Sequence, residues 1–282
     1  MTDWQPSARI DALRRRGEVL GAIRRFFAEK AVLEVEAPVL STGATPAPYL
    51  ESFRTRYSGA GGGRDLYLHT SPEFSLKRLL AAGSGPVYSL GKVFRQGEAG
   101  RVHNPEFTML EWYRPGWDHH RLMNEVEALV REVAPGLPEG ERLTYQALFE
   151  RYAGLDPHRA GIDELRSAAA GPDLPDMGDD RDGWLDLLLT HRIEPRLDPA
   201  VPTFVYDYPA SQAALAKVRG GEPPVAERFE LYCGGMELAN GFHELQDAAE
   251  QRRRFEQELA SRRAAGLAQV PIDERFLAAL EH

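Results

Sequence analysis

Apolar residues in the first half of the chain recur with two different periods, which predict helices and strands in alternation. Apolar positions from Ser7 to about Lys30 follow the spacing of one helical face, which predicts an amphipathic helix. The stretch VLEVEAPVL, residues 32–40, alternates apolar and acidic side chains and is predicted to be a half-exposed strand that stops at Pro38. The same reasoning predicts strands at 66–70, 85–96 and 103–115, and helices at 71–83 and 118–136.

The second half of the chain predicts a helical segment followed by a return to strands. Residues from about 135 to 200 are rich in Pro, Gly and Asp and contain only short helical patterns, which indicates a helical insertion. Strand patterning returns at 203–209 and 228–242, and the Gly234-Gly235 pair predicts a two-residue hairpin turn. Helical patterns close the chain at 247–266 and 273–280. Together the elements predict an α+β fold, which we assign to a single domain over residues 1–282.

Composition narrows the class of protein. The formal net charge of −9 argues against broad, non-specific binding to a nucleic-acid backbone. The one cysteine, Cys233, excludes an internal disulfide and a multi-cysteine metal site, and this is typical of a reducing compartment. No stretch approaches the roughly 18 continuous apolar residues of a membrane span, and no signal peptide is recognisable. We therefore expect a globular cytoplasmic protein that does not enter a membrane.

The predicted strand at 103–115 gathers several reactive side chains on one face. Because side chains alternate along a strand, Phe107, Glu111 and Tyr113 share a face. A carboxylate beside a tyrosine suits an ammonium group, and Phe107 can stack on a flat ring. Cationic side chains of the kind that bind polyphosphates lie just upstream, at Arg95, Arg101 and His103. The alternative interpretation is an edge strand with a solvated charged loop.

The predicted hairpin at 228–242 carries a pair of carboxylates. A turn at Gly234-Gly235 pairs Tyr232 with Glu237, which makes Glu230 and Glu237 diagonal neighbours. Two close carboxylates repel each other unless a cation lies between them, and Mg²⁺ is the hard cation that takes such ligands. Two glutamates on a solvated hairpin face remain the alternative.

Other polar residues near these segments are interpreted in simpler terms. Asn240 and Glu244 continue the strand beyond the hairpin, and Glu244 is a further acceptor for a cationic substrate. His119 and His120 have no metal-ligand spacing with another His or Cys and are interpreted as surface residues. Asp118 is the predicted cap of the helix that contains them.

Three segments resemble the class II aminoacyl-tRNA synthetases. VFRQGEAGRVHNPEFTMLEWY is similar to motif 2 of that family, in the version found in lysyl-tRNA synthetase. HTSPEFSLKRLL and RFELYCGGMELANGFHEL match the same family in order, and the resemblance covers the chain from Ala8 onward. LEWYRP, TFVYDYPASQAALA and ELANGFHEL are most similar to a subgroup of lysyl-tRNA synthetase paralogues that attach (R)-β-lysine to elongation factor P. The fold that this implies is an antiparallel sheet flanked by helices.

The resemblance implies a role for each candidate residue. Arg95 would be the catalytic residue and would hold the α-phosphate of ATP and the substrate carboxylate. The remaining ATP-binding roles fall to His103 at the γ-phosphate, Phe107 and Asn104 at the adenine, and Glu230 and Glu237 through Mg²⁺. The residues implied to surround a lysine-like substrate are Glu73, Glu111, Tyr113, Asn240 and Glu244. The segment 32–40 resembles motif 1, which implies a homodimer.

The sequence departs from the family pattern at several points. The glutamate expected two residues after the motif 2 arginine is replaced by Gly97, and Glu98 follows it. Neither an anticodon-binding domain nor a motif 3 segment of the GxGxxR type is recognisable, and we therefore expect both to be absent.

Three functions are compatible with these observations. The first is an ATP-dependent ligase that activates (R)-β-lysine or lysine as an adenylate and transfers it to a lysine of elongation factor P, without binding tRNA. The second is a catalytically impaired paralogue that binds lysine. The third is lysylation of tRNA by a stand-alone catalytic domain.

Overall fold

The chain divides into two units in the computed structural model, which describes residues 4–100, 103–169, 171 and 174–282. The first unit comprises Met1–Gly116 and Gln246–His282, and the second comprises Trp117–Leu245. Helices and both parallel and antiparallel strand pairs occur among the described residues, so the predicted α+β class is confirmed.

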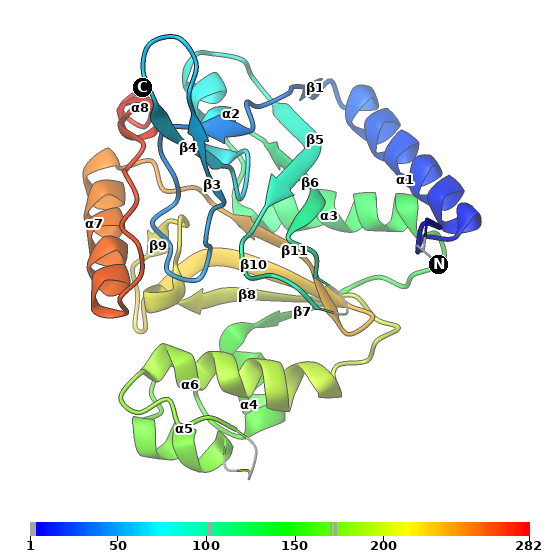
Figure 1. The fold of residues 1–282 in the computed structure, drawn as a ribbon. Coiled ribbons are helices and arrows are strands. Elements are labelled where there is room, and N and C mark those ends of the chain that lie inside the picture. Colours follow the sequence, from blue (N-terminus) through cyan, green and yellow to red (C-terminus); the bar gives the residue numbers. More distant parts are fainter. Residues whose placement is uncertain (1–3, 101–102, 170, 172–173) are drawn as a thin grey trace. The chain divides into compact units, whose positions relative to one another are not determined.

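The first unit contains two small sheets and four helices among its described residues (Figure 1). One sheet has the order β1-β5-β6, with strands Leu33–Glu34, Val87–Phe94 and Glu106–Tyr113. The other has the order β2-β4-β3, with strands Leu40–Ser41, Arg64–Leu68 and Arg54–Tyr57. The helices are α1 (Ile10–Glu29), α2 (Glu73–Ala81), α7 (Ala248–Ala264) and α8 (Glu274–Ala279).

Aromatic contacts hold the helices of the first unit in place. Helix α1 buries Phe27, whose ring stacks on Tyr88 of β5 at a centroid distance of 4.6 Å. Phe74 of α2 stacks on Phe276 of α8 at 4.4 Å, so the short last helix covers the start of α2. Stacked rings of this kind add to the free energy gained by burying their apolar area.

The second unit is built on a sheet with the order β11-β10-β8-β7, and β9 pairs with β10. Its strands are β7 (Glu141–Thr144), β8 (Thr203–Pro209), β9 (Val218–Arg219), β10 (Val225–Cys233) and β11 (Met236–Phe242). Its α-helices are α3 (His119–Val133), α4 (Tyr145–Ala153), α5 (Ile162–Ala169) and α6 (Arg181–Leu188). A π-helical turn at Leu189–Ile193 and 3-10 turns at Glu194–Arg196 and Ala210–Gln212 complete its helical elements.

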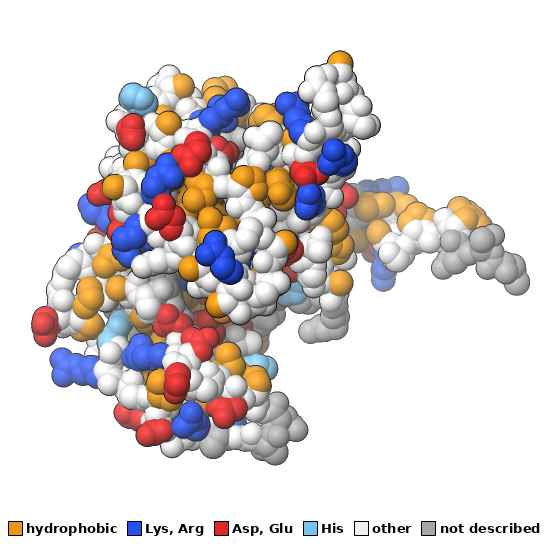
Figure 2. Space-filling model, turned by 60° about the vertical axis from the view of Figure 1, so that its left-hand side comes forward, with side chains coloured by type: hydrophobic (Ala, Val, Ile, Leu, Met, Phe, Trp, Pro, Cys, Tyr) orange, Lys and Arg blue, Asp and Glu red, His pale blue; other side chains and the backbone are white. Residues whose placement is uncertain are grey.

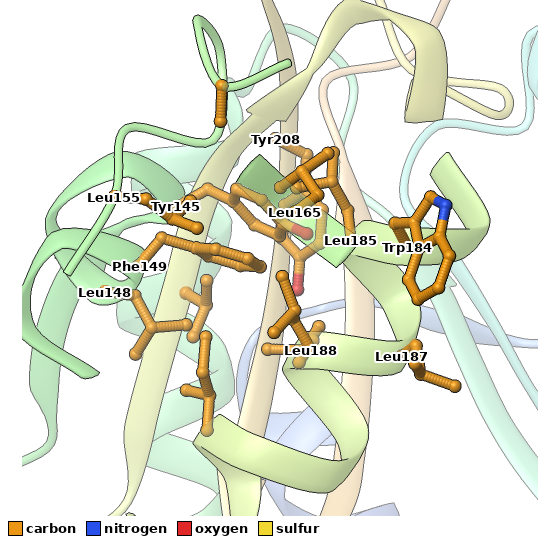
Figure 3. Packing of buried hydrophobic residues seen from close by; sticks show 14 of the residues in the cluster. Tyr145, Leu148, Phe149, Leu155, Leu165, Trp184, Leu185, Leu187, Leu188 and Tyr208 are labelled. Atoms are coloured by element: carbon orange, nitrogen blue, oxygen red, sulfur yellow. The ribbon is translucent and has the colours of Figure 1, made fainter. Parts of the chain in front are cut away.

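The core of the second unit lies between this sheet and helices α4 to α6 (Figure 3). Tyr145 stacks on Phe149 at a centroid distance of 4.5 Å, and Tyr145 also contacts Tyr208 of β8 at 4.6 Å. Leu185 and Leu188 of α6 are fully buried against these rings. The short helical patterns of residues 135–200 are therefore amphipathic, and they pack on the face of the sheet that carries Tyr208.

Most predicted elements occur close to their expected positions. Asp118 caps α3 by accepting a hydrogen bond from the backbone N–H of Arg121 at 2.8 Å, as predicted. The predicted strand at 32–40 is wrong in length, because only Leu33–Glu34 and Leu40–Ser41 pair with a neighbouring strand. Strands β3, β7 and β9 and helix α5 are additional to the prediction. No helix in the described part of the chain is long and apolar enough to cross a membrane.

Candidate active site

The antiparallel pair β5–β6 presents the side chains predicted to bind an ammonium group. Its register runs from Val87 opposite Tyr113 to Phe94 opposite Glu106 without a bulge, so Phe107, Glu111 and Tyr113 lie on one face. The Tyr113 hydroxyl donates to Glu111 Oε1 at 2.9 Å, which confirms the shared face.

Ser71 is a member of this group that the sequence interpretation missed. Its hydroxyl donates to Glu111 Oε2 at 2.5 Å and accepts from the Glu73 backbone N–H at 3.0 Å. Ser71 therefore links the start of α2 to the carboxylate on β6. The Ser-Pro pair just before a helix is the sequence signal for this turn, because serine commonly bonds the backbone two residues further on.

Arg95 lies at the end of β5 and faces the aromatic ring of Phe107. Its guanidinium carbon is 5.2 Å from the ring centroid, and its Nε donates to the carbonyl oxygen of Thr70 at 3.4 Å. Gly97 adopts φ +90°, a conformation that favours glycine, and Glu98 then reaches back to Arg95 Nη1 at 3.4 Å. Glu98 therefore supplies a carboxylate to Arg95 despite its one-residue displacement from the expected position.

Glu73, at the start of α2, forms a buried ion pair with Lys77. Lys77 Nζ lies 2.6 Å from Glu73 Oε1, and the two side chains are only 6% and 15% exposed. Burial raises the pKa of Glu258 on α7 to about 7, with Arg254 opposing the rise and Glu73 adding to it. Lys77 and Glu258 are thus two titratable groups near Glu73 that the sequence interpretation missed.

The predicted phosphate-binding loop between β5 and β6 is described only in part. His103 and Asn104 are exposed, and the His103 carbonyl oxygen accepts from the backbone N–H of Gly100 at 3.0 Å. Arg101 lies outside the described residues.

In the second unit, β10 and β11 form the predicted hairpin with an added bulge. Gly234 and Gly235 adopt φ values of +63° and +72°, and Tyr232 pairs with Glu237 as predicted. The register then shifts by one residue, so that Leu231 pairs with Ala239 and Glu230 pairs with Asn240. The bulge places Glu237 and Asn240 on the same face as Glu230.

Glu230 is a buried carboxylate that accepts four hydrogen bonds. Its Oε1 accepts from Asn240 Nδ2 at 3.0 Å and from a guanidinium N–H of Arg228. Its Oε2 accepts from the hydroxyl of Tyr208 at 2.6 Å and from that of Tyr232. Burial and the neighbouring Glu230 charge raise the pKa of both tyrosines, so both hydroxyls stay protonated as donors.

The other residues predicted for this part of the site differ in burial. Glu237 and Asn240 are exposed, whereas Glu244 is half-buried where its backbone bridges to Ala216. Carboxylate oxygens are suitable ligands for Mg²⁺, and Glu237 lies on the same face as Glu230, so the donor set fits this ion. Groups of three or more His, Cys, Asp or Glu side chains with metal-binding geometry do not occur among the described residues.

The interpretation of His119 as a surface residue is wrong. Its side chain is only 1% exposed, and its Nε2 lies 3.2 Å from Asp207 Oδ1. Asp207 also accepts from Arg219 at 2.6 Å. Burial alone would raise the pKa of Asp207, but the hydrogen bonds from His119 and Arg219 lower it. The sequence missed this ionic network because its members are widely separated along the chain.

The predicted site residues form one group within each unit. The first unit gathers Arg95, Phe107, Glu111 and Tyr113, with Glu73 close by at the start of α2. The second unit gathers Glu230, Glu237 and Asn240 on the β10–β11 hairpin.

Comparison with known proteins identifies the family. Residues 2–282 match the family described as tRNA synthetases class II (D, K and N). The elongation factor P–(R)-β-lysine ligases of Edwardsiella ictaluri (strain 93-146) and Proteus mirabilis (strain HI4320) are each 52% identical, over 100% of this chain and 88% of theirs. The ligase of the same name from Salmonella paratyphi B (strain ATCC BAA-1250 / SPB7) is 52% identical over 98% of this chain and 86% of its own length. The chain therefore belongs to the class II (D, K and N) tRNA synthetase family.

Proposed function

We propose that the chain is an ATP-dependent ligase that activates (R)-β-lysine and attaches it to elongation factor P. The proposal is supported by the names of relatives that are 52% identical over nearly the whole chain. The structural observation that carries it is the carboxylate of Glu111, which Ser71 and Tyr113 orient on the strand that also bears Phe107. A fixed anionic group of this kind suits a substrate with a side-chain ammonium.

The ATP end of the site is assigned to the first unit. Phe107 stacks on the adenine, with Asn104 nearby, and Arg95 binds the α-phosphate together with the substrate carboxylate. The position of the Arg95 guanidinium, 5.2 Å from the Phe107 ring centroid, supports this division of roles. His103 binds the γ-phosphate from the exposed loop.

Five residues are assigned to the amino-acid substrate. Glu111 and Glu244 balance the side-chain ammonium, the Tyr113 hydroxyl oxygen accepts a hydrogen bond from the substrate, and Asn240 donates one to it. Glu73 binds the other amino group, and its ion pair with Lys77 at 2.6 Å holds the carboxylate in position.

We assign Mg²⁺ to Glu230 and Glu237. When bound there, the ion neutralises phosphate charge on ATP. Glu237 is exposed on the hairpin, and Glu230 must release one of its four donors to become a ligand.

The reaction consists of two displacements. A carboxylate oxygen of the amino acid attacks the α-phosphorus of ATP, and the bond to pyrophosphate breaks, which leaves an aminoacyl-adenylate. The ε-amine of a lysine of elongation factor P then attacks the acyl carbon, AMP leaves with the bonding electrons, and the amine loses a proton. Arg95 stabilises the charge that develops at phosphorus, so the protein acts by positioning and electrostatics and uses no nucleophile of its own.

We further propose that the protein acts in the cytoplasm, where its acceptor, a translation factor, is found. We also propose that it forms a homodimer through its N-terminal segments. Large apolar side chains are exposed on α1 and on the strands that follow it, notably Ile10 at 62%, Leu13 at 49% and Leu33 at 56%. Apolar side chains that are exposed this far commonly mark an interface.

The test of this function is the acceptor reaction itself. Purified protein is incubated with ATP, Mg²⁺, (R)-β-lysine and elongation factor P, and the intact mass of the factor is measured. We expect a mass increase of one lysyl residue at one lysine, which is lost in Arg95→Ala. Pyrophosphate exchange with lysine but without modification of the factor would favour tRNA lysylation. Lysine binding without exchange would favour a binding protein.

A further inference from the structure

Arg228 on β10 is a largely buried cation, 16% exposed, that contacts two polar residues of the hairpin, Glu230 and Asn240. Its Nη2 donates to Glu230 Oε1, and its Nε donates to Asn240 Oδ1 at 3.3 Å. Its Nη1 donates to the backbone carbonyl oxygen of Gln212 at 2.9 Å, which anchors the side chain to a separate segment. The guanidinium also lies 4.6 Å from the ring centroid of Tyr208.

Arg228 and the residue before it, Glu227, form a β-bulge in β10. Between Ala226 and Phe229 the register shifts, so that Glu227 and Arg228 together oppose Asp207 of β8. Asp207 has a φ of +58°, an uncommon value for a residue other than glycine.

An ionic network holds the other side of this bulge. Arg219 donates to Asp207 at 2.6 Å and to Glu227 at 3.1 Å, and His243 Nδ1 lies 2.6 Å from Glu227 Oε2. With Asp207 and Glu227 bound in this way, the bulge is fixed and Arg228 is directed to Glu230 and Asn240.

We infer that Arg228 is a positioning residue for the reaction, because it sets the orientation of the Asn240 amide. Glu230 keeps its three other donors, Asn240, Tyr208 and Tyr232, so its carboxylate stays in place without Arg228. The inference rests on the function proposed above, in which Asn240 binds the amino acid. Arg228 has only donors, so it holds the carbonyl oxygen of the Asn240 amide. The amide nitrogen of Asn240 is then turned towards Glu230 and keeps one further N–H for the substrate.

Substitution of Arg228 should therefore change the binding of the amino acid while ATP binding is kept. A lysine at this position retains the charge but cannot contact Glu230, Asn240 and the Gln212 carbonyl oxygen with one planar fork. In Arg228→Lys we expect the KM for the amino acid to rise about tenfold or more. A hydrogen bond to a charged group typically contributes about this factor to an equilibrium constant. The KM for ATP should change by less than about threefold.

The measurement is pyrophosphate exchange at saturating ATP and varied amino acid, and then the reverse, together with calorimetry of amino-acid binding without ATP. A purely structural defect reduces the fraction of active protein, which lowers kcat and leaves both KM values unchanged. The matched control is Arg142→Lys in the same unit. Arg142 lies on β7, two strands from β10, and its guanidinium is 2.8 Å from the Glu127 carboxylate. We expect wild-type KM values for this control.

Two results would overturn the inference while the proposed function stands. One is an active Arg228→Lys protein whose amino-acid KM and dissociation constant equal those of the wild type. The other is an equal rise in KM for ATP and amino acid, which would show a general distortion of the site. Absence of exchange in the wild-type protein would instead reject the proposed function.

Discussion

Glu111 is the residue on which recognition of the substrate ammonium most depends. Both of its oxygens accept hydrogen bonds, from Ser71 at 2.5 Å and from Tyr113 at 2.9 Å. In Glu111→Gln the side chain keeps its size but loses the charge, so a bound ammonium is poorly matched. We expect affinity for the amino acid to fall by about 2 to 5 kcal/mol, as for a truncated charge pair, with ATP affinity nearly unchanged. Calorimetry with each ligand separately measures both effects.

A control on the same strand separates this effect from a general loss of charge. Glu106 at the start of β6 is exposed and pairs with Lys92 at 2.9 Å. Glu106→Gln should leave both affinities unchanged, because exposed pairs contribute little. Equal losses for amino acid and ATP in Glu111→Gln would show that the ammonium pocket has been assigned to the wrong residues.

For single residues, the sequence predicted which side chains share a face of a regular strand, but it did not predict the β-bulge in β11. Phe107, Glu111 and Tyr113 share a face by simple alternation, which the unbroken register confirms. Glu237 and Asn240 are three residues apart on one strand, so alternation alone places them on opposite faces. The bulge at Leu238 removes this conflict. An odd spacing between two residues of one proposed site is therefore a sequence signal for a bulge.

Among the elements, the long amphipathic helices were the most predictable and the short strands the least. Helix α1 is twenty residues long and repeats its apolar face several times, so its period is unmistakable. Strands β1 and β2 have two residues each. The alternation of apolar and acidic residues over 32–40 predicted one strand, but this segment pairs with neighbouring strands only near its two ends. Strand β7 forms by parallel pairing with β8, which lies about sixty residues later in the chain. The pattern of apolar residues within β7 alone does not predict such a long-range pairing.

Helix α7 carries a titratable group whose effect on stability follows from its burial. The pKa of Glu258 is raised to about 7 by burial, with Arg254 opposing and Glu73 adding to the shift, whereas its ordinary value is 4.5. The native protein therefore keeps this proton at pH values where the unfolded chain releases it. The contribution is fully favourable below the unfolded pKa and is lost as pH rises through the folded pKa.

We therefore expect Glu258→Gln to flatten the decline of stability between about pH 5 and about pH 8. The free energy of unfolding of the variant should exceed that of the wild type at the upper pH by up to about 3 kcal/mol. Urea unfolding at several pH values measures it. Glu256→Gln, on the exposed side of the same helix, should follow the wild-type profile. A wild-type profile that is flat over this range would show that Glu258 is already ionised in the native protein.

The charge of the whole molecule bears on the choice of acceptor. Proteins bind tRNA largely through Lys and Arg contacts to phosphates, and each contact releases counterions. The chain has a net charge of −9, and basic and acidic side chains are interspersed on the face drawn in Figure 2. Such a surface does not form the continuous positive field that attracts a polyanion.

We accordingly expect tRNA to bind no more tightly than a non-specific ligand, with a dissociation constant of about 1 µM or weaker at physiological salt. Gel-shift titrations with tRNA at low and physiological salt measure this, with a lysyl-tRNA synthetase as the positive control. Added tRNA should also leave the rate of pyrophosphate exchange unchanged, while elongation factor P is modified in the same buffer. A complex with tRNA that forms well below that concentration and resists salt would contradict the expectation. It would mean that a local cluster of basic side chains overrides the net charge, and tRNA would then become the acceptor to test first.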